Sequence, residues 1–195
     1  MPELGRRTIL RALGLFGVVG ACGPTRATGL GGQDTDKMAS VWWAGATIAG
    51  VADPLLLYCI SLVETGYYGA DGRLRPYPWA IRFASGPVYP ASRQLAERYL
   101  GDVGDTDDID IGIMQVNWGQ HRALVRSPVE LLDPTTNVIV ASSILREALD
   151  SAPTNLILGV GRYHSWDSSA AIAYGREVFD LYGSVAGRSG GTSCS

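Results

Sequence analysis

The sequence predicts one compact, mostly α-helical domain with a single irregular segment. Apolar residues recur at spacings of three and four along most of the chain, which is the period of a helix that buries one side. Residues that start and stop helices flank these stretches. The chain has 195 residues, of which 46% are hydrophobic. That is enough to bury one sizeable core and hardly two.

The central predicted helix covers residues 53–66. Asp53 is a candidate N-cap, Pro54 suits the first turn, and Gly66 is a typical C-terminal stop. The helix is hydrophobic nearly all round, which is the pattern of a helix buried in the middle of a domain. Four further helices, one of which again begins with Asp-Pro, are predicted over residues 91–101, 133–150, 154–165 and 168–183.

The segment 71–90 interrupts the helical pattern. It contains four prolines and no helical period. We therefore predict a long loop or a short β excursion there, because proline cannot donate to the hydrogen bonds of a central strand. Long loops in compact domains frequently carry function.

The two ends of the chain differ from its middle. Residues 1–22 place paired arginines ahead of a short apolar stretch, which is the layout of a secretory signal and is too short to cross a bilayer. Residues 23–40 and 184–195 are rich in Gly, Ser and Thr, and we predict a flexible linker and a flexible tail. The folded domain is then expected over residues 41–183.

The signal resembles two known export signals. The stretch "RRTILR" is similar to the twin-arginine signal, and "VVGAC" is similar to a lipoprotein processing site with Cys22 as the lipidated residue. A small-residue cleavage pattern is also satisfiable nearby. Lipidation of Cys22, plain release and an uncleaved anchor therefore stay open, as do the twin-arginine and Sec routes. We expect an exported, periplasmic protein, with membrane attachment if Cys22 is lipidated.

Charge and cysteine content exclude several classes of partner. The net charge is −3 and no basic run occurs, so we expect no nucleic-acid partner. Three cysteines without CxxC spacing and two histidines are too few for a structural zinc site, and the acidic stretch 101–110 lacks the glycine and glutamate of a calcium loop. No metal or cofactor is predicted. Cys59 is expected to be a buried thiol, although a pair with Cys194 stays open.

Glu64 is the candidate catalytic acid. It falls in the last turn of the most hydrophobic predicted helix. Desolvation and the negative end of the helix dipole both disfavour the ionised carboxyl, so that Glu64 could hold its proton and act as a general acid. The alternative is a frayed helix end whose glutamate reaches water.

The stretch "DIDIGIMQVNWGQHR", residues 108–122, is a candidate sugar-binding segment. Gly112 permits a close backbone approach, Met114 offers a soft apolar contact, and Gln115 and Asn117 present amides. Amides both donate and accept hydrogen bonds, as the hydroxyl and acetamido groups of sugars require.

Four motifs together resemble a known enzyme family. "SLVETGY", "DIGIMQVN", "LLDPTTNVIVASSILREAL" and "GVGRYHS" occur in the order found in lytic transglycosylases of the soluble (SLT) type, which are relatives of goose-type lysozyme and cleave bacterial peptidoglycan. The resemblance implies a lysozyme-like helical domain. It also implies a peptidoglycan substrate.

The resemblance assigns roles to individual residues. Glu64 matches the catalytic glutamate of the family, and Thr65 stands where a serine usually follows. Asn137 matches the asparagine that opens the next helix and is expected to be structural. The turn that lines the sugar cleft is matched by Gly112, Ile113, Met114, Gln115 and Asn117.

The last motif departs from the family pattern. Tyr163 matches the tyrosine of the Ala-Tyr-Asn-Ala-Gly motif and is expected at the substrate. His164 and Ser165 replace the Asn-Ala that follows, so His164 takes the place of a substrate-contacting asparagine. This change does not affect the acid.

One acid then serves both steps of the implied reaction. Glu177 is expected to be a surface or packing residue, and the acidic stretch to be solvated, so no second carboxylate is assigned. In the family, the glutamate protonates the bond between N-acetylmuramic acid and N-acetylglucosamine, and a 1,6-anhydro sugar forms. Two alternatives remain, a hydrolytic muramidase of the same fold and a non-catalytic peptidoglycan-binding scaffold. "RPYPWAIR" with "GRYHS" resembles the subgroup attached to conjugation and type IV secretion machinery.

Overall fold

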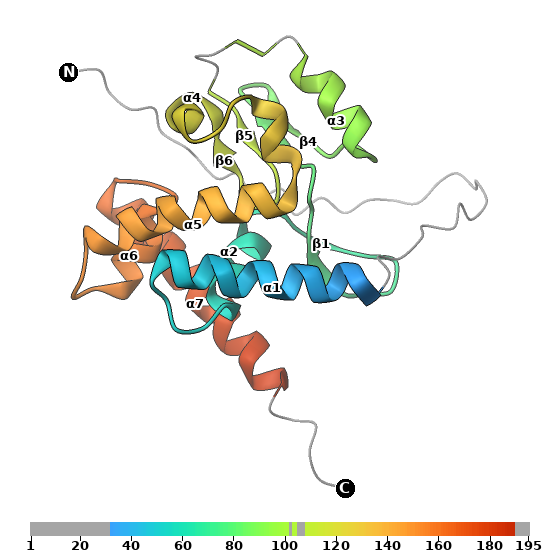
Figure 1. Ribbon diagram of the computed structural model, residues 1–195. Coiled ribbons are helices and arrows are strands. Elements are labelled where there is room, and N and C mark those ends of the chain that lie inside the picture. The colour runs from blue at the N-terminus through green and yellow to red at the C-terminus, as the bar shows by residue number, and fades with distance from the viewer. Residues whose placement is uncertain (1–31, 102, 105–107, 190–195) are drawn as a thin grey trace, which may run out of the picture.

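The computed structural model describes residues 32–101, 103–104 and 108–189 (Figure 1). The predicted signal, Cys22, Cys194 and several acidic residues of the stretch 101–110 lie outside these residues. The described chain is mostly helical with a small antiparallel β part, which confirms the predicted mostly α class. The longer helices are α1 (Gly32–Ala49), α2 (Leu55–Thr65), α3 (Arg93–Leu100), α5 (Pro134–Asp150), α6 (Leu156–Arg162) and α7 (Ser168–Ser189).

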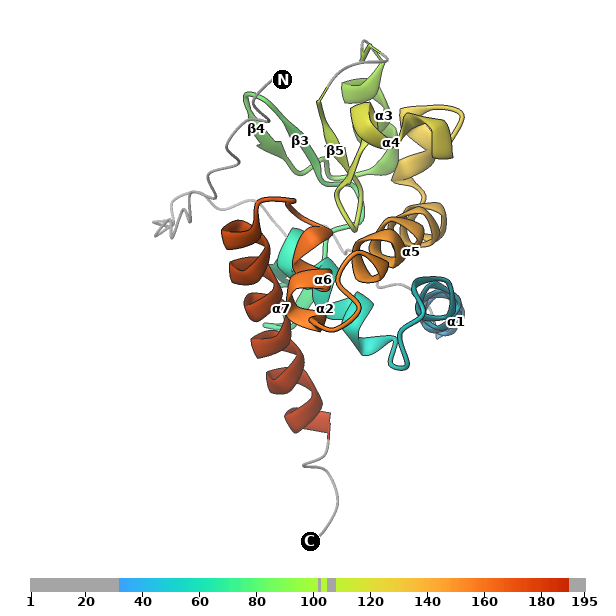
Figure 2. The same cartoon turned by 90° about the vertical axis from the view of Figure 1, so that its left-hand side faces the viewer.

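Helix α2 lies at the centre of the helical part, where it packs against α1 and α7 (Figure 2). Leu57, Cys59 and Ile60 are fully buried on it. At its start, the Asp53 carboxylate accepts a hydrogen bond from the Leu55 amide at 2.9 Å, as expected of a capping residue. The helix ends before Gly66, where a Cβ would collide with the Leu62 carbonyl oxygen. The glycine stop predicted from the sequence is therefore confirmed.

Helices α1 and α7 extend beyond the predicted domain. Residues 32–40, predicted as linker, form the first half of α1, and residues 184–189, predicted as tail, end α7. Met38 and Val185 pack against the core, so an apolar side chain links each extension to it. In the described chain α1 therefore begins at Gly32 and α7 ends at Ser189, so both helices run past the predicted domain ends at 41 and 183.

Helices α5 and α6 each begin with a capping side chain, and each packs against a longer helix. Asp133 caps α5 by accepting a hydrogen bond from the Thr136 amide at 2.8 Å, and Asn155 caps α6 in the same way through the Leu158 amide at 3.0 Å. α5 packs on α1, and α6 packs on α7. The second contact is close, because a Cβ at Gly161 would collide with backbone atoms of α7.

The segment 71–90 forms part of two small sheets, which confirms the predicted β excursion. β1 (Gly66–Tyr68) and β2 (Leu74–Pro76) form an antiparallel pair, which is the first sheet. The second sheet has the order β4-β3-β5-β6, made of β4 (Gly86–Val88), β3 (Ile81–Phe83), β5 (Asp110–Ile111) and β6 (Val116–Asn117). The remaining elements are α4 (Trp118–His121) and the 3-10 helices Arg122–Leu124 and Pro128–Leu132.

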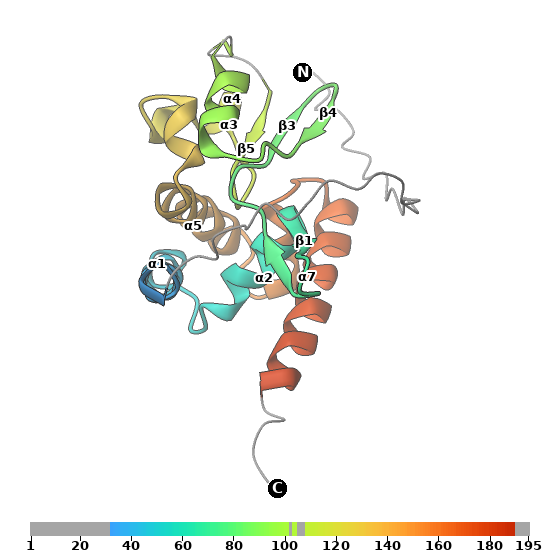
Figure 3. The ribbon, with the colours of Figure 1, turned by 90° about the vertical axis from the view of Figure 1, so that its right-hand side faces the viewer.

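The two kinds of structure occupy different regions. α1, α2, α5, α6 and α7 gather in one region, and β3, β4, β5, α3 and α4 gather in the other (Figure 2). The hairpin β1–β2 lies on the helical side, next to α2 and in front of α7 (Figure 3). β1 begins directly after the last residue of α2, so the C-terminal end of α2 lies where the helices join the β segment.

Cys59 is fully buried and has no disulfide partner among the described residues. Burial raises the pKa of its thiol to about 11. This confirms the buried thiol. No helix in the part of the chain that the structure describes is both long and apolar enough to cross a membrane.

Candidate functional site

Glu64 lies in the last turn of α2, and 13% of its side chain is exposed. Its Oε1 atom accepts a hydrogen bond of 2.7 Å from the hydroxyl of Tyr174 on α7. This bond holds the carboxyl group from the side of the core, because Tyr174 is itself only 3% exposed. The alternative prediction, that Glu64 lies at a frayed helix end and reaches water, therefore does not describe the structure.

Tyr174 is the residue that sequence reasoning missed. It sits among the apolar positions of a predicted helix, where a tyrosine looks like any other packing residue. The available signal was weak: a buried tyrosine hydroxyl usually has a hydrogen-bond partner. Nothing in the sequence identifies that partner as Glu64, which lies 110 positions earlier.

His164 lies beside the same carboxyl group. Its ring stacks on that of Tyr174, with the centroids 4.7 Å apart and the planes at 1°. Its Nδ1 is 3.8 Å from Glu64 Oε1, which is too long for a hydrogen bond and within reach of an ion pair when the imidazole is protonated. His164 was predicted to contact the sugar. The structure places it next to the acid, with 15% of its side chain exposed.

Tyr163 is bonded to the turn that contains Met114, and it lies near enough to Glu64 to feel its charge. Its hydroxyl donates a hydrogen bond of 2.6 Å to the Met114 carbonyl oxygen. Burial raises the pKa of Tyr163 well above its usual value, and the charges of Glu64 and Asp110 raise it further. The pKa of Tyr174 is raised in the same way, by burial first and then by Glu64. Both phenols therefore stay protonated and act as donors.

The arrangement distinguishes the two oxygens of Glu64. Oε1 accepts the hydrogen bond from Tyr174, which has no other proton to give and does not ionise at neutral pH. Oε1 is therefore the oxygen that the protein holds from the side of the core. The site can accordingly do general acid and base chemistry with one oriented carboxyl group.

The Thr65 hydroxyl is a structural junction. Its single proton is shared between the carbonyl oxygens of Ile113 at 2.9 Å and Ser61 at 3.1 Å, and its oxygen accepts from the Tyr77 amide at 3.2 Å. Thr65 is 3% exposed. It was predicted to bind substrate; its hydroxyl instead joins the end of α2 to the 112–115 turn and to the residue after β2.

The 112–115 turn has a demanding backbone. Gly112 has φ of +81° and Gln115 has φ of 50°. A Cβ at Gly112 would collide with the Asn137 amide and the Leu131 carbonyl oxygen, so the glycine is required by packing rather than by ligand approach. Gln115 donates to the Gly112 carbonyl oxygen at 2.9 Å and to that of Ala80 at 3.2 Å.

Asn137 fixes this turn from α5. Its side chain donates to the carbonyl oxygens of Ile111 at 2.8 Å and Leu131 at 2.9 Å, and it accepts from the Met114 amide at 2.8 Å. Asn137 is fully buried, which confirms the structural role predicted for it.

Two predicted sugar contacts are turned inward. Met114 is fully buried, and Asn117 is 6% exposed. The Asn117 amide donates to Asp108 at 2.6 Å and to Asp110 at 2.9 Å, and its oxygen caps α4 through the Gln120 amide at 3.0 Å. These side chains hold the turn and the short strand after it, and neither is open to solvent.

No group of three or more His, Cys, Asp or Glu residues in the described chain could hold a metal ion. Two surface hollows of about 550 and about 560 Å³ lie away from the acid. The first is lined by residues that include Arg93 and Glu130, and the second by residues that include Arg146 and Tyr182. Glu64 lines neither hollow. The candidate active site is instead the cluster of Glu64, Tyr174 and His164, because there a buried hydroxyl orients a carboxyl group.

No protein-family model matches the sequence, and no solved structure matches the chain. The candidate function is therefore inferred from the residues around Glu64.

Proposed function

We propose that this protein is a lytic transglycosylase with a lysozyme-like domain that cleaves the β-1,4 bond between N-acetylmuramic acid and N-acetylglucosamine in peptidoglycan. The observation that carries the proposal is the Glu64 carboxyl group, which ends a buried central helix and accepts a 2.7 Å hydrogen bond from Tyr174. A single oriented carboxyl group fits a reaction that uses one residue as acid and then as base. The four sequence motifs that resemble the SLT family support the same assignment.

The reaction begins with proton transfer from Glu64. The carboxyl proton passes to the glycosidic oxygen, the bond from that oxygen to C1 of the muramic acid breaks, and its electron pair stays with the leaving sugar. Tyr174 remains a donor to Oε1 and stabilises the carboxylate that is left.

The second step returns Glu64 to its starting state. The carboxylate accepts the proton of the C6 hydroxyl of the same muramic acid while that oxygen bonds to C1. The product is a 1,6-anhydro end, and no water is consumed. A hydrolytic muramidase would use the same acid and differ only in the group that attacks C1.

The place of action follows from the substrate. Peptidoglycan lies outside the inner membrane, so we propose that the signal at residues 1–22 exports the protein to the periplasm, through the twin-arginine or Sec route. Lipidation of Cys22 would hold it at a membrane. The resemblance of "RPYPWAIR" and "GRYHS" to the secretion-linked subgroup favours local opening of the cell wall for a conjugation or type IV secretion apparatus.

Product analysis tests this function. Purified full-length protein is incubated with insoluble peptidoglycan, and the released fragments are examined by mass spectrometry. We expect anhydro ends from the parent protein. The Glu64→Gln variant keeps the shape of the side chain and lacks the transferable proton, so its turnover should fall by roughly a hundred-fold to ten-thousand-fold.

Circular dichroism must show that the Glu64→Gln variant is folded. Reducing ends in place of anhydro ends would identify a muramidase. A Glu64→Gln variant that retains a tenth of the parent turnover would contradict the assignment of the acid, and binding without any turnover by the parent would indicate a scaffold.

A further inference from the structure

One face of the β1–β2 hairpin gathers aromatic and charged side chains. Tyr67 on β1 lies directly opposite Arg75 on β2. Tyr77, which follows β2, places its ring against that of Tyr67, and Arg73, which precedes β2, reaches the same Asp71 carboxylate as Arg75. Tyr68 pairs with Leu74 and points to the opposite face.

Three tyrosines continue this face beyond the hairpin. Tyr67 meets Tyr77 edge to face at 5.1 Å, and Tyr77 meets Tyr89 edge to face at 5.5 Å. The Tyr77 hydroxyl donates to the Pro90 carbonyl oxygen at 2.9 Å, which fixes the middle ring. The outer rings stay accessible, since Tyr67 is 39% and Tyr89 is 55% exposed. The cluster is therefore both rigid and open to a ligand.

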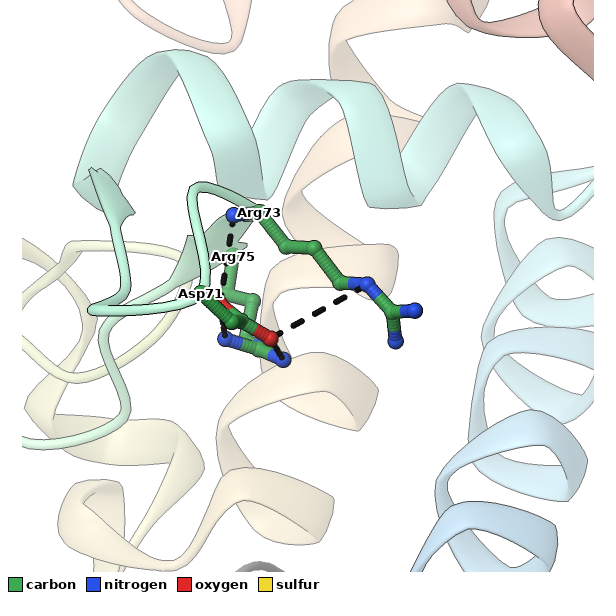
Figure 4. A network of polar contacts seen from close by, with 3 residues as sticks. All are labelled: Asp71, Arg73 and Arg75. Atoms are coloured by element: carbon green, nitrogen blue, oxygen red, sulfur yellow. Dashed lines mark hydrogen bonds and ion pairs between the residues drawn. The ribbon is translucent and has the colours of Figure 1, made fainter.

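The two arginines of the face differ in how closely they contact Asp71. Asp71 accepts two hydrogen bonds from Arg75, at 2.8 and 2.5 Å (Figure 4). These bonds, with the Arg73 amide, lower the pKa of Asp71 to about 2. Arg73 meets the same carboxylate only at 3.9 Å, and its side chain is 80% exposed. Asp71 is thus engaged by Arg75, and the Arg73 guanidinium extends into solvent with a positive charge.

This face adjoins the candidate acid. The Tyr77 amide donates to the Thr65 carbonyl oxygen at 3.1 Å, and Thr65 directly follows Glu64 in the chain. Tyr67 lies one residue beyond the glycine that ends α2. The face therefore begins three residues after Glu64 in the chain, which is close enough for one long polymer to meet both.

We propose that Tyr67, Tyr77, Tyr89 and Arg73 form a peptidoglycan-binding face, on which the tyrosines stack against the sugar rings of a glycan strand and Arg73 binds a carboxylate of its stem peptide. Aromatic rings offer flat apolar surfaces to the carbon-bound hydrogens of a sugar, and guanidinium groups bind carboxylates through paired hydrogen bonds. The inference rests on the proposed function, because that function supplies the polymer. It adds a binding determinant separate from Glu64.

The test measures binding in the Glu64→Gln background, so that the ligand is not degraded. Full-length variants are co-sedimented with insoluble peptidoglycan over a range of concentrations. Tyr67→Ala and Tyr89→Ala should each raise the Kd by about three- to tenfold, which is the loss of affinity expected for one aromatic contact. Tyr68→Ala is the matched control, because Tyr68 is a 74% exposed tyrosine on the opposite face of the same strand, and its Kd should not change.

The role of Arg73 is tested with two ligands. Arg73→Gln should weaken binding to intact peptidoglycan and leave unchanged the binding to peptidoglycan stripped of its stem peptides by an amidase. An equal loss on both ligands would overturn the carboxylate assignment. Tyrosine variants that bind as tightly as Tyr68→Ala, or a parent that does not sediment with peptidoglycan, would overturn the face as a whole.

Failure of this inference and failure of the proposed function give different results. A protein that releases anhydro fragments but binds equally well without the tyrosines contradicts only the binding face. A protein that binds through the tyrosines but releases no fragments contradicts only the proposed catalysis.

Discussion

At the scale of single residues, the candidate site consists of one carboxyl group and the side chains that orient it. Glu64 could be predicted, because an acid at the end of an apolar helix stands out in the sequence. Tyr174 could not, since its role depends on the packing of α7 against α2. Thr65, Met114 and Asn117 were predicted to bind substrate. In the structure the polar side chains of Thr65 and Asn117 bond within the protein, and Met114 is fully buried.

Replacing Tyr174 with phenylalanine tests the orientation of the acid. Tyr174→Phe keeps the buried ring and removes the donor to Glu64 Oε1. A hydrogen bond to a charged group contributes about 1.5–3 kcal/mol, so peptidoglycan turnover should fall by at least about tenfold. The release of soluble fragments measures this change.

Tyr182→Phe is the control for this experiment. Tyr182 also lies on α7, but its hydroxyl donates to Asp53 at the far end of α2. Its removal should leave turnover unchanged. Equal activity of Tyr174→Phe and the parent, at an unchanged melting temperature, would reduce Tyr174 to a packing residue.

At the scale of elements, helix starts were predicted better than helix lengths. The Asp-Pro signals located the beginnings of α2 and α5, because capping is a local interaction between neighbouring residues. Helix α1 was not among the predicted helices, and α7 ends later than predicted. Met38 and Val185 pack against a distant core, a contact that composition does not report. Strands of two or three residues, such as β5 and β6, are too short to show a period of two.

His121, the last residue of the short helix α4, is expected to make the stability of the protein depend on pH. Burial lowers the pKa of His121 below its usual value, and the weaker opposing influence is Glu147. The folded state therefore binds this proton less readily than the unfolded chain, and the free energy of unfolding should fall as the pH drops through the usual imidazole range. We expect the melting temperature of the parent to fall between about pH 7.5 and pH 5.5.

The variant His121→Gln removes the titrating group and should flatten this dependence. The lowered pKa values of Asp53 and Asp71 act at more acidic pH and do not interfere in that window. A variant whose melting temperature falls as steeply as that of the parent would show that other groups control stability there.

At the scale of the whole molecule, the proposed activity requires export. If Cys22 is lipidated, Cys22→Ser should move the protein from the membrane fraction to the soluble periplasm. Turnover by the purified protein should not change, because Cys22 precedes the described domain. Fractionation of cells followed by immunoblotting measures the shift.

Cys194→Ser, at the other end of the chain, should leave the fractionation unchanged. A parent protein found wholly in the soluble periplasm would exclude the lipid anchor. A parent found in the cytoplasm would contradict export and with it most of the proposed function.

The bond between Tyr174 and Glu64 has a consequence for biosynthesis. It joins residues 110 positions apart, on the central helix and on the last described helix. The ribosome therefore makes the acid early and the group that orients it late. A chain whose translation stops before α7 carries the glutamate without its partner and without the helix that packs against α2 and α6, so premature products of this gene should be inert toward the wall that the complete protein is proposed to cut.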